Sequence, residues 1–249
     1  MKKLFVFGHQ GLGDHILCNG IYHELSQHDL KIFVFVKRRY RESVQRMTRN
    51  NPRIVVIPLP NWRFWSYLKV FCWLSELIKL KSVKLGTFGD NFLIQGTRFD
   101  QNFYLQCGVN FDARWDKFEF QRNLENEVIL QNHYGIGENP YIFLHEDKAR
   151  GYEIDRNLLP KGIRIIEPLM ENKGFQIFDY YRLLINAKEI HCIESSFAAF
   201  IESLQLRKVR LFAHRYARPN ALYDFRYEYT YRSPWKILLN PEEKLHEDK

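Results

Sequence analysis

The chain opens with a short apolar run of strand type at residues 2–7, which ends at a loop with three glycines at residues 8–13. After this loop, apolar residues recur at helical spacing and fall on one face of the predicted helix: Ile16, Leu17, Ile21 and Leu25. A strand, a tight turn and a helix in this order predict the start of a βαβ unit, in which successive strands run parallel.

Two more strands are expected in the first half of the chain. Residues 31–36 and 53–57 are rich in β-branched and aromatic side chains, and a helix that runs through Met47 fits between them. Residues 85–117 are glycine-rich and polar, so we expect loops and short pieces there. Residues 119–134 then predict another helix.

The helix expected at residues 62–81 has an unusual composition. One apolar face follows helical spacing through Phe64, Tyr67, Phe71, Leu74 and Ile78, whereas Trp62, Trp65 and Trp73 lie off that face beside Lys69, Glu76 and Lys79. The pattern fits a core helix with an extra aromatic flank. It also fits a basic and aromatic surface that meets a membrane interface or a glycan acceptor. The charged residues argue against a transmembrane helix.

The second half of the chain repeats the alternation of strands and helices. Its expected strands are residues 141–145, 163–166, 189–193 and 209–212, and its expected helices are residues 178–187 and 197–204. Glycines and a proline at residues 135–140 mark a boundary before it. We therefore predict an α/β fold of two Rossmann-like lobes with parallel sheets, an N-terminal domain at 1–134 and a C-terminal domain at 135–249.

Asp14 is the first candidate for chemistry. The glycines Gly8, Gly11 and Gly13 stand in the order G-x-x-G-x-G, which differs from the G-x-G-x-x-G order of a dinucleotide-binding turn. A carboxylate directly after them is favoured by the helix dipole but would repel a pyrophosphate at the same amides. The loop therefore predicts one carboxylate at the carboxyl edge of a parallel sheet, where open α/β folds bind ligands. A purely structural helix cap is the alternative.

The run Gly11-Leu12-Gly13-Asp14 followed by an amphipathic helix resembles the N-terminal motif of the lipopolysaccharide heptosyltransferases, which form glycosyltransferase family 9. Members of that family have the two-Rossmann architecture called GT-B, with lobes that face each other across a cleft. The resemblance implies that Asp14 is the catalytic base and that Gly11 and Gly13 shape the substrate loop. It implies the same two-lobed fold for this chain.

The first donor-side candidates follow the strand at residues 141–145. His145 ends this strand, and a polar loop with Lys148, Arg150 and Gly151 comes next. A guanidinium binds phosphate through two hydrogen bonds, and glycine lets the backbone approach closely. The alternative is a solvated turn. Adjacent acidic residues in this loop do not form a metal-binding D-x-D motif, so we expect no metal site.

The second donor-side candidates are Glu194, Ser195, Ser196 and Phe197, at the turn between a buried-type strand and a helix. Hydroxyls and amides at a helix N-terminus form an anion site, although Ser195 could equally cap the helix without a ligand. The run resembles the D-T-G-x-x-H-L-A donor-diphosphate motif of the heptosyltransferases. Ala199 stands where that motif has histidine, which leaves the donor open. Ser-Ser-Phe at such a turn is also similar to fucosyltransferases of the same architecture.

Charge and cysteines restrict the class of protein. The chain of 249 residues has 37 Lys and Arg against 29 Asp and Glu, a net charge of +8, which favours an anionic partner such as a nucleotide-sugar, a nucleic acid or an anionic membrane. The four cysteines are scattered without C-x-x-C or Cys/His spacing, at Cys18, Cys72, Cys107 and Cys192. We expect no disulfide scaffold or zinc site, and a reducing cytoplasm. The N-terminal apolar run is too short for a signal peptide, and no run has the length of a membrane span.

The family resemblance implies a metal-independent glycosyltransferase with a nucleotide-sugar as co-substrate and no other cofactor. Its acceptor would be a glycan or a lipid-linked glycan, with peripheral contact at the inner membrane face. The donor sugar, its nucleotide and the stereochemistry stay open. No nucleic-acid partner is expected, because acidic residues are interspersed along the basic chain.

Two alternatives remain. An NAD(P)-dependent oxidoreductase would need a pyrophosphate at the first glycine loop, which Asp14 opposes. The basic residues 37–39 after the second strand disfavour NAD, but they could meet the 2′-phosphate of NADP. A non-enzymatic nucleic-acid- or glycan-binding protein would use the arginines and tyrosines interleaved over residues 214–232.

Overall fold

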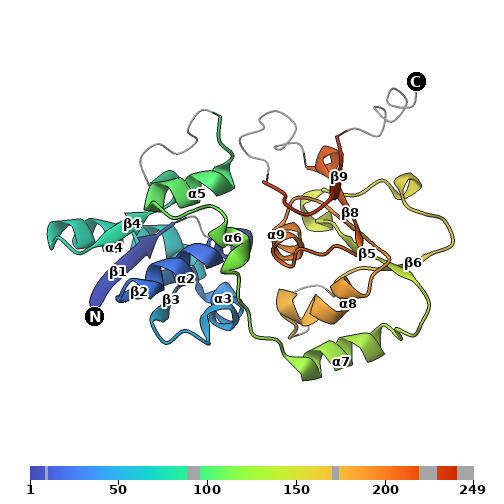
Figure 1. Ribbon diagram of the computed structural model, residues 1–249, viewed down its shortest axis with the longest axis horizontal. Coiled ribbons are helices and arrows are strands. Elements are labelled where there is room, and N and C mark those ends of the chain that lie inside the picture. The colour runs from blue at the N-terminus through green and yellow to red at the C-terminus, as the bar shows by residue number, and fades with distance from the viewer. Residues whose placement is uncertain (9–10, 89–95, 170–173, 219–228, 240–249) are drawn as a thin grey trace. The chain divides into compact units, whose positions relative to one another are not determined.

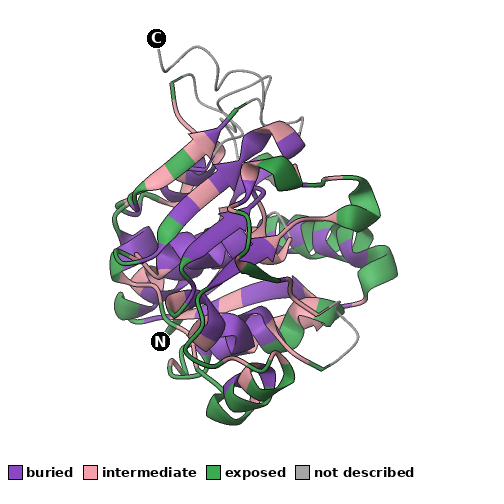
Figure 2. Ribbon diagram, turned by 90° about the vertical axis from the view of Figure 1, so that its right-hand side faces the viewer, coloured by how far each residue is buried: buried purple, intermediate pink, exposed green. Residues whose placement is uncertain are grey.

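The structure is a computed structural model that describes residues 1–8, 11–88, 96–169, 174–218 and 229–239 (Figure 1). The chain divides into two compact units, Met1–Gln121 and Arg122–Lys249. Each unit has its own parallel β-sheet with helices, as the alternation of strands and helices predicts. Buried residues concentrate on the strands of both sheets (Figure 2).

The first unit is built on a four-stranded sheet with the order β3-β2-β1-β4, in which all neighbours run parallel. The strands are β1 (Lys2–Phe7), β2 (Leu30–Lys37), β3 (Ile54–Leu59) and β4 (Ser82–Lys84). The register pairs Val6 with Val34, so the ends of β1 and β2 lie at the same edge of the sheet. Three of the four strands match the predicted runs. The short β4 was not predicted.

The helices of the first unit are α1 (Leu12–Leu17), α2 (Asn19–Gln27), α3 (Arg41–Thr48), α4 (Phe64–Leu77), α5 (Phe99–Cys107) and α6 (Ala113–Asp116). Short 3₁₀ turns are η1 (Arg38–Tyr40), η2 (Asn61–Arg63) and η3 (Gly86–Phe88). Phe7 and Phe35 stack at 5.0 Å on the sheet and pack with Leu68 of α4 in one buried cluster. No helix among the described residues has the length and apolar character needed to cross a membrane.

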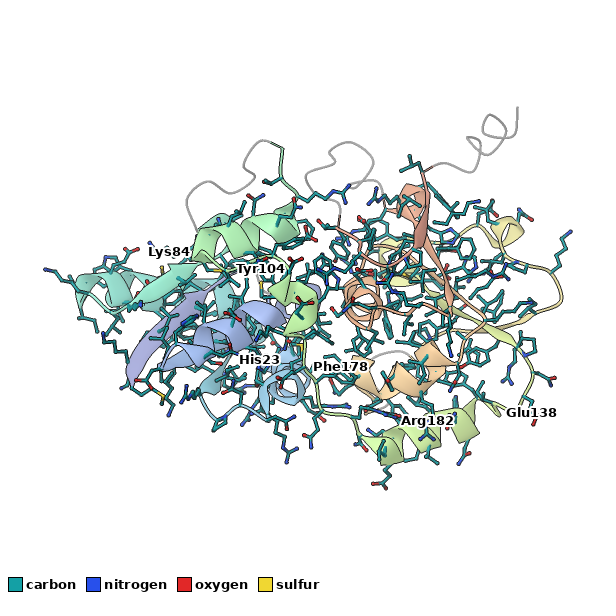
Figure 3. The ribbon with its side chains drawn as sticks, viewed as in Figure 1. His23, Lys84, Tyr104, Glu138, Phe178 and Arg182 are labelled. Atoms are coloured by element: carbon teal, nitrogen blue, oxygen red, sulfur yellow. The ribbon has the colours of Figure 1, made fainter. Side chains whose placement is uncertain are left out.

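Two close contacts hold the helices of the first unit together. A Cβ added to Gly20 of α2 would lie 2.0 Å from the carbonyl oxygen of Ala113, so only glycine lets α2 and α6 approach as they do. Tyr104 of α5, labelled in Figure 3, donates a 2.8 Å hydrogen bond to the carbonyl oxygen of Leu17. The stretch expected to hold only loops and short pieces therefore contains α5 and α6, which pack on the first helices.

The second unit has a five-stranded parallel sheet with the order β6-β5-β7-β8-β9. Its strands are β5 (Tyr141–His145), β6 (Arg164–Ile166), β7 (Glu189–Cys192), β8 (Arg210–His214) and β9 (Trp235–Leu238). Its helices are α7 (Leu124–His133), α8 (Tyr181–Ile185) and α9 (Ser196–Ser203), with 3₁₀ turns η4 (Lys148–Arg150), η5 (Arg156–Leu158), η6 (Ile177–Tyr180) and η7 (Arg215–Ala217). Part of the tyrosine- and arginine-rich tail, residues 219–228, lies outside the described residues.

The chain divides earlier than the predicted boundary between residues 134 and 135. Helix α7 packs within the second unit, where Asn126 donates a 3.0 Å hydrogen bond to the carboxylate of Asp179. Arg182 of α8 donates to the side chain of Gln131 at 2.9 Å, and Arg182 is labelled in Figure 3. The break between the units thus lies before α7, at Gln121 and Arg122.

Candidate active site

Asp14 lies in the first turn of α1, the helix that follows the loop after the carboxyl end of β1. Its Oδ2 accepts a 2.8 Å hydrogen bond from the backbone N–H of Gly11, the residue before the helix. A Cβ at position 11 would lie 3.0 Å from this oxygen, so glycine makes room for the carboxylate. Asp14, Gly11 and Gly13 are all partly exposed. The carboxylate therefore caps the helix and is held at the edge of the sheet.

A histidine and a lysine lie near Asp14. His15 is fully buried, its Nδ1 lies 3.1 Å from the hydroxyl of Tyr22, and burial, assisted by the charge of Lys37, lowers the pKa of His15 to about 3. Its ring is therefore neutral at neutral pH. Lys37 ends the adjacent strand β2, and burial lowers its pKa, with Arg39 adding to this effect and Asp14 opposing it. This edge combines a carboxylate with a partly desolvated cation.

From the sequence, Lys37 was a candidate only for contact with the 2′-phosphate of NADP, and its proximity to Asp14 was not predicted. The signal was present in the chain, because Lys37 is the last residue of the strand that pairs with β1. Parallel strands bring their carboxyl ends to one edge.

In the second unit, Ser195 caps the N-terminus of α9 (its Oγ lies 3.5 Å from the backbone N–H of Ala198). The same hydroxyl lies 3.1 Å from Nδ1 of His145, the last residue of β5. His145 and Phe197 pack with ring centroids 4.5 Å apart. The structure thus brings together three predicted donor-side residues. Ser195 and Ser196 are partly exposed, whereas Phe197 is buried.

His145 is also a neutral histidine. Burial lowers its pKa to about 4, although the nearby acidic residues Asp147 and Glu146 act in the opposite direction. At neutral pH the ring offers one hydrogen-bond donor and one acceptor. The turn between β7 and α9 therefore presents hydroxyls and helix amides beside an uncharged ring.

Glu194 lies apart from the exposed part of this turn. Its carboxylate is buried, and Oε1 accepts hydrogen bonds from Nε of Arg215 at 3.1 Å, from the N–H of Tyr229 at 3.2 Å and from the hydroxyl of Tyr231 at 3.1 Å. Burial raises the pKa of Glu194, with Arg215 and these hydrogen bonds opposing it. Arg218 donates to the carbonyl oxygen of Glu194. Glu194 fastens later segments of the chain to the base of the turn.

The predicted phosphate-binding cations after β5 are engaged with carboxylates. Lys148 contacts Glu167 at 2.8 Å and Glu146 at 3.2 Å, and Arg150 contacts Asp147 at 2.5 Å. Lys148 and Arg150 are exposed, and their pairs with Glu167 and Asp147 are surface ion pairs, which contribute only about 0–1 kcal/mol. An arriving phosphate can displace these two carboxylates at low cost, whereas the Glu146 carboxylate is buried. Gly151 has φ 74°, the left-handed conformation that ends the turn η4.

Two buried histidines in the second sheet were not singled out from the sequence. Nδ1 of His191 lies 2.9 Å from Nε2 of His214, and Nε2 of His191 lies 2.9 Å from the carboxylate of Glu189. Nδ1 of His214 lies 3.1 Å from the hydroxyl of Tyr216. This chain of hydrogen bonds satisfies buried polar groups on β7 and β8. The sequence does not tell which strands are neighbours, so it could not pair the two histidines.

Two cavities are lined by residues outside the candidate site. A groove of about 580 Å³ runs along α4, and a cavity of about 340 Å³ lies by Gly135, Tyr141 and Arg164, at the amino ends of β5 and β6. Neither is lined by Asp14 or Ser195. Within the described parts of the chain, no cluster of three or more His, Cys, Asp or Glu is arranged to hold a metal ion.

No protein-family model and no curated protein matches this chain. Solved structures do match it. A family 9 glycosyltransferase from Veillonella parvula gives a TM-score of 0.61 at 12% identity and covers 95% of this chain and 86% of its own. The ADP-heptose lipopolysaccharide heptosyltransferase II of E. coli gives 0.56 at 12% identity and covers 96% of this chain and 90% of its own.

A third similar structure is the iron-containing dodecameric glycosyltransferase TibC from enterotoxigenic E. coli. It has a TM-score of 0.54 at 12% identity and covers 96% of this chain and 62% of its own. At such identities the likeness concerns the fold. It confirms the predicted α/β fold of two Rossmann-like lobes, which the family 9 structure shares. That the two sheets face each other across a cleft stays a prediction.

Proposed function

We propose that this protein is a glycosyltransferase that moves a sugar from a nucleotide-sugar donor to a hydroxyl of a glycan or lipid-linked acceptor. The observation that carries the proposal is the placement of Asp14. Its carboxylate is held by the N–H of Gly11 at the carboxyl edge of β1, in a chain with the fold of family 9 glycosyltransferases. The proposed chemistry needs no metal, because helix amides and cations neutralise the leaving group.

In this proposal the second unit holds the donor. The first turn of α9 directs backbone N–H groups at the diphosphate, and the hydroxyls of Ser195 and Ser196 add hydrogen bonds. Arg150 and Lys148 exchange their surface carboxylate partners for phosphate oxygens. Glu194 contributes indirectly, because its buried hydrogen bonds fix the turn that precedes the helix.

Asp14 acts on the acceptor. As the acceptor oxygen attacks the anomeric carbon, its proton passes to the Asp14 carboxylate. The bond from the anomeric carbon to the phosphate oxygen breaks, and its electron pair leaves with the nucleoside diphosphate.

The oxidoreductase alternative conflicts with the geometry of the first loop. A pyrophosphate bound there would use the N–H groups at the start of α1, but the carboxylate of Asp14 already accepts from Gly11. The negatively charged pyrophosphate of a dinucleotide would have to displace the negatively charged carboxylate of Asp14 from that amide.

We also propose a cytoplasmic location with peripheral contact at the inner membrane face, where a lipid-linked acceptor would be found. The four cysteines are unpaired thiols, as a reducing compartment favours. Cys18, Cys72 and Cys192 are buried, so they need no partner to be protected.

A ligand screen tests the proposal. The melting temperature is measured with UDP-, GDP-, ADP- and CMP-sugars and with NADPH, and transfer is then assayed with the sugar that stabilises. We expect one nucleotide-sugar to raise the melting temperature, because a ligand that binds only the folded state stabilises by mass action. Stabilisation by NADPH alone would contradict the proposal and favour the oxidoreductase.

A further inference from the structure

Helix α4 belongs to the first unit (Figure 1), and large apolar residues occur both on its buried side, which packs against the sheet, and among its exposed residues. Its buried residues recur once per turn: Phe64, Leu68, Cys72 and Ser75. Nearly all its other residues are exposed, and most of these are large and apolar. A helix that is hydrophobic all round is normally covered on every side.

The exposure is large and continuous along the helix and the turns that flank it. Trp73 is 60% exposed and Leu77 is 62% exposed, and their spacing places them opposite the buried stripe. Ile78, directly after the helix, is 63% exposed. The remaining exposed apolar residues in this region are Trp62, Trp65, Tyr67, Val70, Phe71, Leu74 and Leu80. A patch this large on a water-soluble surface marks an interaction site.

A groove of about 580 Å³ lies on one flank of the helix. Two indoles, Trp65 and Trp73, line it together with Lys69, Glu76 and Thr87. The flank is therefore apolar with a charged border. Such a border suits a site where apolar and polar surroundings meet, since Trp and Lys each combine an apolar body with a polar end.

The charges around the helix are mostly of one sign. Residues 61–85 contain five basic residues, Arg63, Lys69, Lys79, Lys81 and Lys84, against the single acid Glu76, which is itself paired with Lys84. The guanidinium of Arg63 lies 4.4 Å from the ring centroid of Trp62. The patch therefore combines exposed indoles and aliphatic side chains with an excess of positive charge.

We propose that residues 61–81, with α4 at their centre, form a docking surface for an anionic lipid bilayer, with the helix lying in the plane of the membrane. A helix of 14 residues is about 21 Å long, too short to span the hydrocarbon core but sufficient to lie along it. Interfacial helices bury their apolar face in the headgroup region and keep basic side chains at the phosphates. Trp is enriched at this depth.

Charge decides between a lipid surface and a second copy of the chain. A symmetric dimer brings the same patch of both copies together, so basic side chains would face basic side chains. An anionic bilayer is complementary in charge and attracts nearby lysines and arginines. This docking surface rests on the proposed function and adds a membrane partner to it. Vesicle binding can nevertheless be measured without any sugar transfer.

The test uses vesicle flotation with the full chain, comparing vesicles of phosphatidylglycerol and phosphatidylcholine with vesicles of phosphatidylcholine alone. We expect binding to the anionic vesicles, weakened by high salt. Trp73→Glu and Leu77→Glu should abolish it. Leu105→Glu on α5 is the matched control, since Leu105 is 54% exposed but lies outside the patch, and it should bind as the parent does.

Lys79→Gly separates charge from folding. Lys79 has φ 52°, a left-handed conformation that favours glycine, so this variant should melt at a higher temperature than the parent. Its partition onto anionic vesicles should nevertheless fall roughly fivefold, the effect of about 1 kcal/mol for one basic residue near the surface. Rising stability with falling binding excludes unfolding as the cause.

Three results would overturn the inference. The parent protein fails to bind anionic vesicles, or Trp73→Glu binds as well as the parent does, or the parent self-associates in light scattering while Trp73→Glu stays monomeric. The last result would assign the patch to contacts between copies. Transfer to a soluble acceptor should be the same in Trp73→Glu and the parent, so a failure of docking is distinguishable from a failure of the proposed function.

Discussion

The two helices that carry the candidate residues, α1 in the first unit and α9 in the second, are capped at their N-termini by different chemical groups. At α1 a carboxylate occupies the first amide, since Oδ2 of Asp14 accepts from the N–H of Gly11. At α9 the capping group is the neutral hydroxyl of Ser195, which lies 3.5 Å from the amide nitrogen of Ala198 and 3.1 Å from Nδ1 of His145. A helix N-terminus whose amide already binds a carboxylate repels further anions. A helix N-terminus capped by a neutral hydroxyl keeps its positive potential. In the proposed mechanism, the two capping residues therefore suit acceptor chemistry at the edge with Asp14 and donor phosphate at the edge with Ser195.

Removing the charge from the first edge should have the largest effect. Asp14→Asn keeps a side-chain oxygen for the N–H of Gly11, so the melting temperature should barely change. The amide cannot take up the acceptor proton, and the transfer rate should fall by about 10²–10⁴-fold. Donor affinity should stay the same, because the diphosphate is assigned to α9. Transfer by Asp14→Asn at nearly the parent rate would show that the aspartate only caps the helix.

Placing a carboxylate at the second edge should give the next largest effect. Ser196→Asp puts a negative charge in the first turn of α9, where the helix dipole stabilises it, so the fold should be preserved. The same charge would repel the donor diphosphate, and affinity should fall on the order of 100-fold. Calorimetric titration measures this loss, with Ser196→Asn, which has nearly the same size as aspartate but no charge, as the matched control. Unchanged affinity in Ser196→Asp would place the diphosphate elsewhere.

A smaller effect is shared by the two edges, because each has a buried neutral histidine. The folded-state pKa values of His15 and His145 are lowered, to about 3 and about 4, so below pH 6.5 the unfolded chain binds more protons than the folded one. The contribution of the two neutral histidines to the free energy of unfolding is therefore fully present above pH 6.5 and is lost as the pH falls below it. For fully buried His15 the loss between pH 7 and pH 5.5 should be about 1 kcal/mol.

Urea unfolding at several pH values measures this dependence. We expect a shallower slope of unfolding free energy against pH in His15→Gln, whatever its stability at neutral pH. An unchanged slope would mean that other groups cause the acid destabilisation, and His145→Gln would then be the variant to compare.

The sequence predicted the strands with continuous apolar runs but not the weakest one. Strands β1, β2 and β5 contain runs of apolar residues with many β-branched or aromatic side chains, and most of these are buried. Strand β4 has only three residues, Ser-Val-Lys, all partly exposed, and it depends on its pairing with β1. Propensity cannot reveal such a strand, because its stability comes from a neighbour that is distant along the chain.

The candidate site shows the same limit. Local patterns located Asp14 after its glycines and Ser195 at a helix start, because caps and turns are set by residues close together in the chain. The resemblance to the donor-diphosphate motif also places Glu194 among the donor-binding candidates. Its actual partners, Tyr229 and Tyr231, lie far along the chain, and only the fold brings them to the carboxylate.

These distant partners have a consequence for how the protein is made. Besides Glu194, the buried carboxylate of Glu202 on α9 accepts from the backbone N–H of Arg232 and from Nε1 of Trp235. Both ends of α9 therefore depend on chain that leaves the ribosome after the helix itself. Until residues 229–235 emerge, folding of the second unit would bury these two carboxylates without these donors, at a cost in free energy. Its proposed donor edge should consequently be among the last parts to fold during translation, whereas the first unit can fold while the second is still being synthesised.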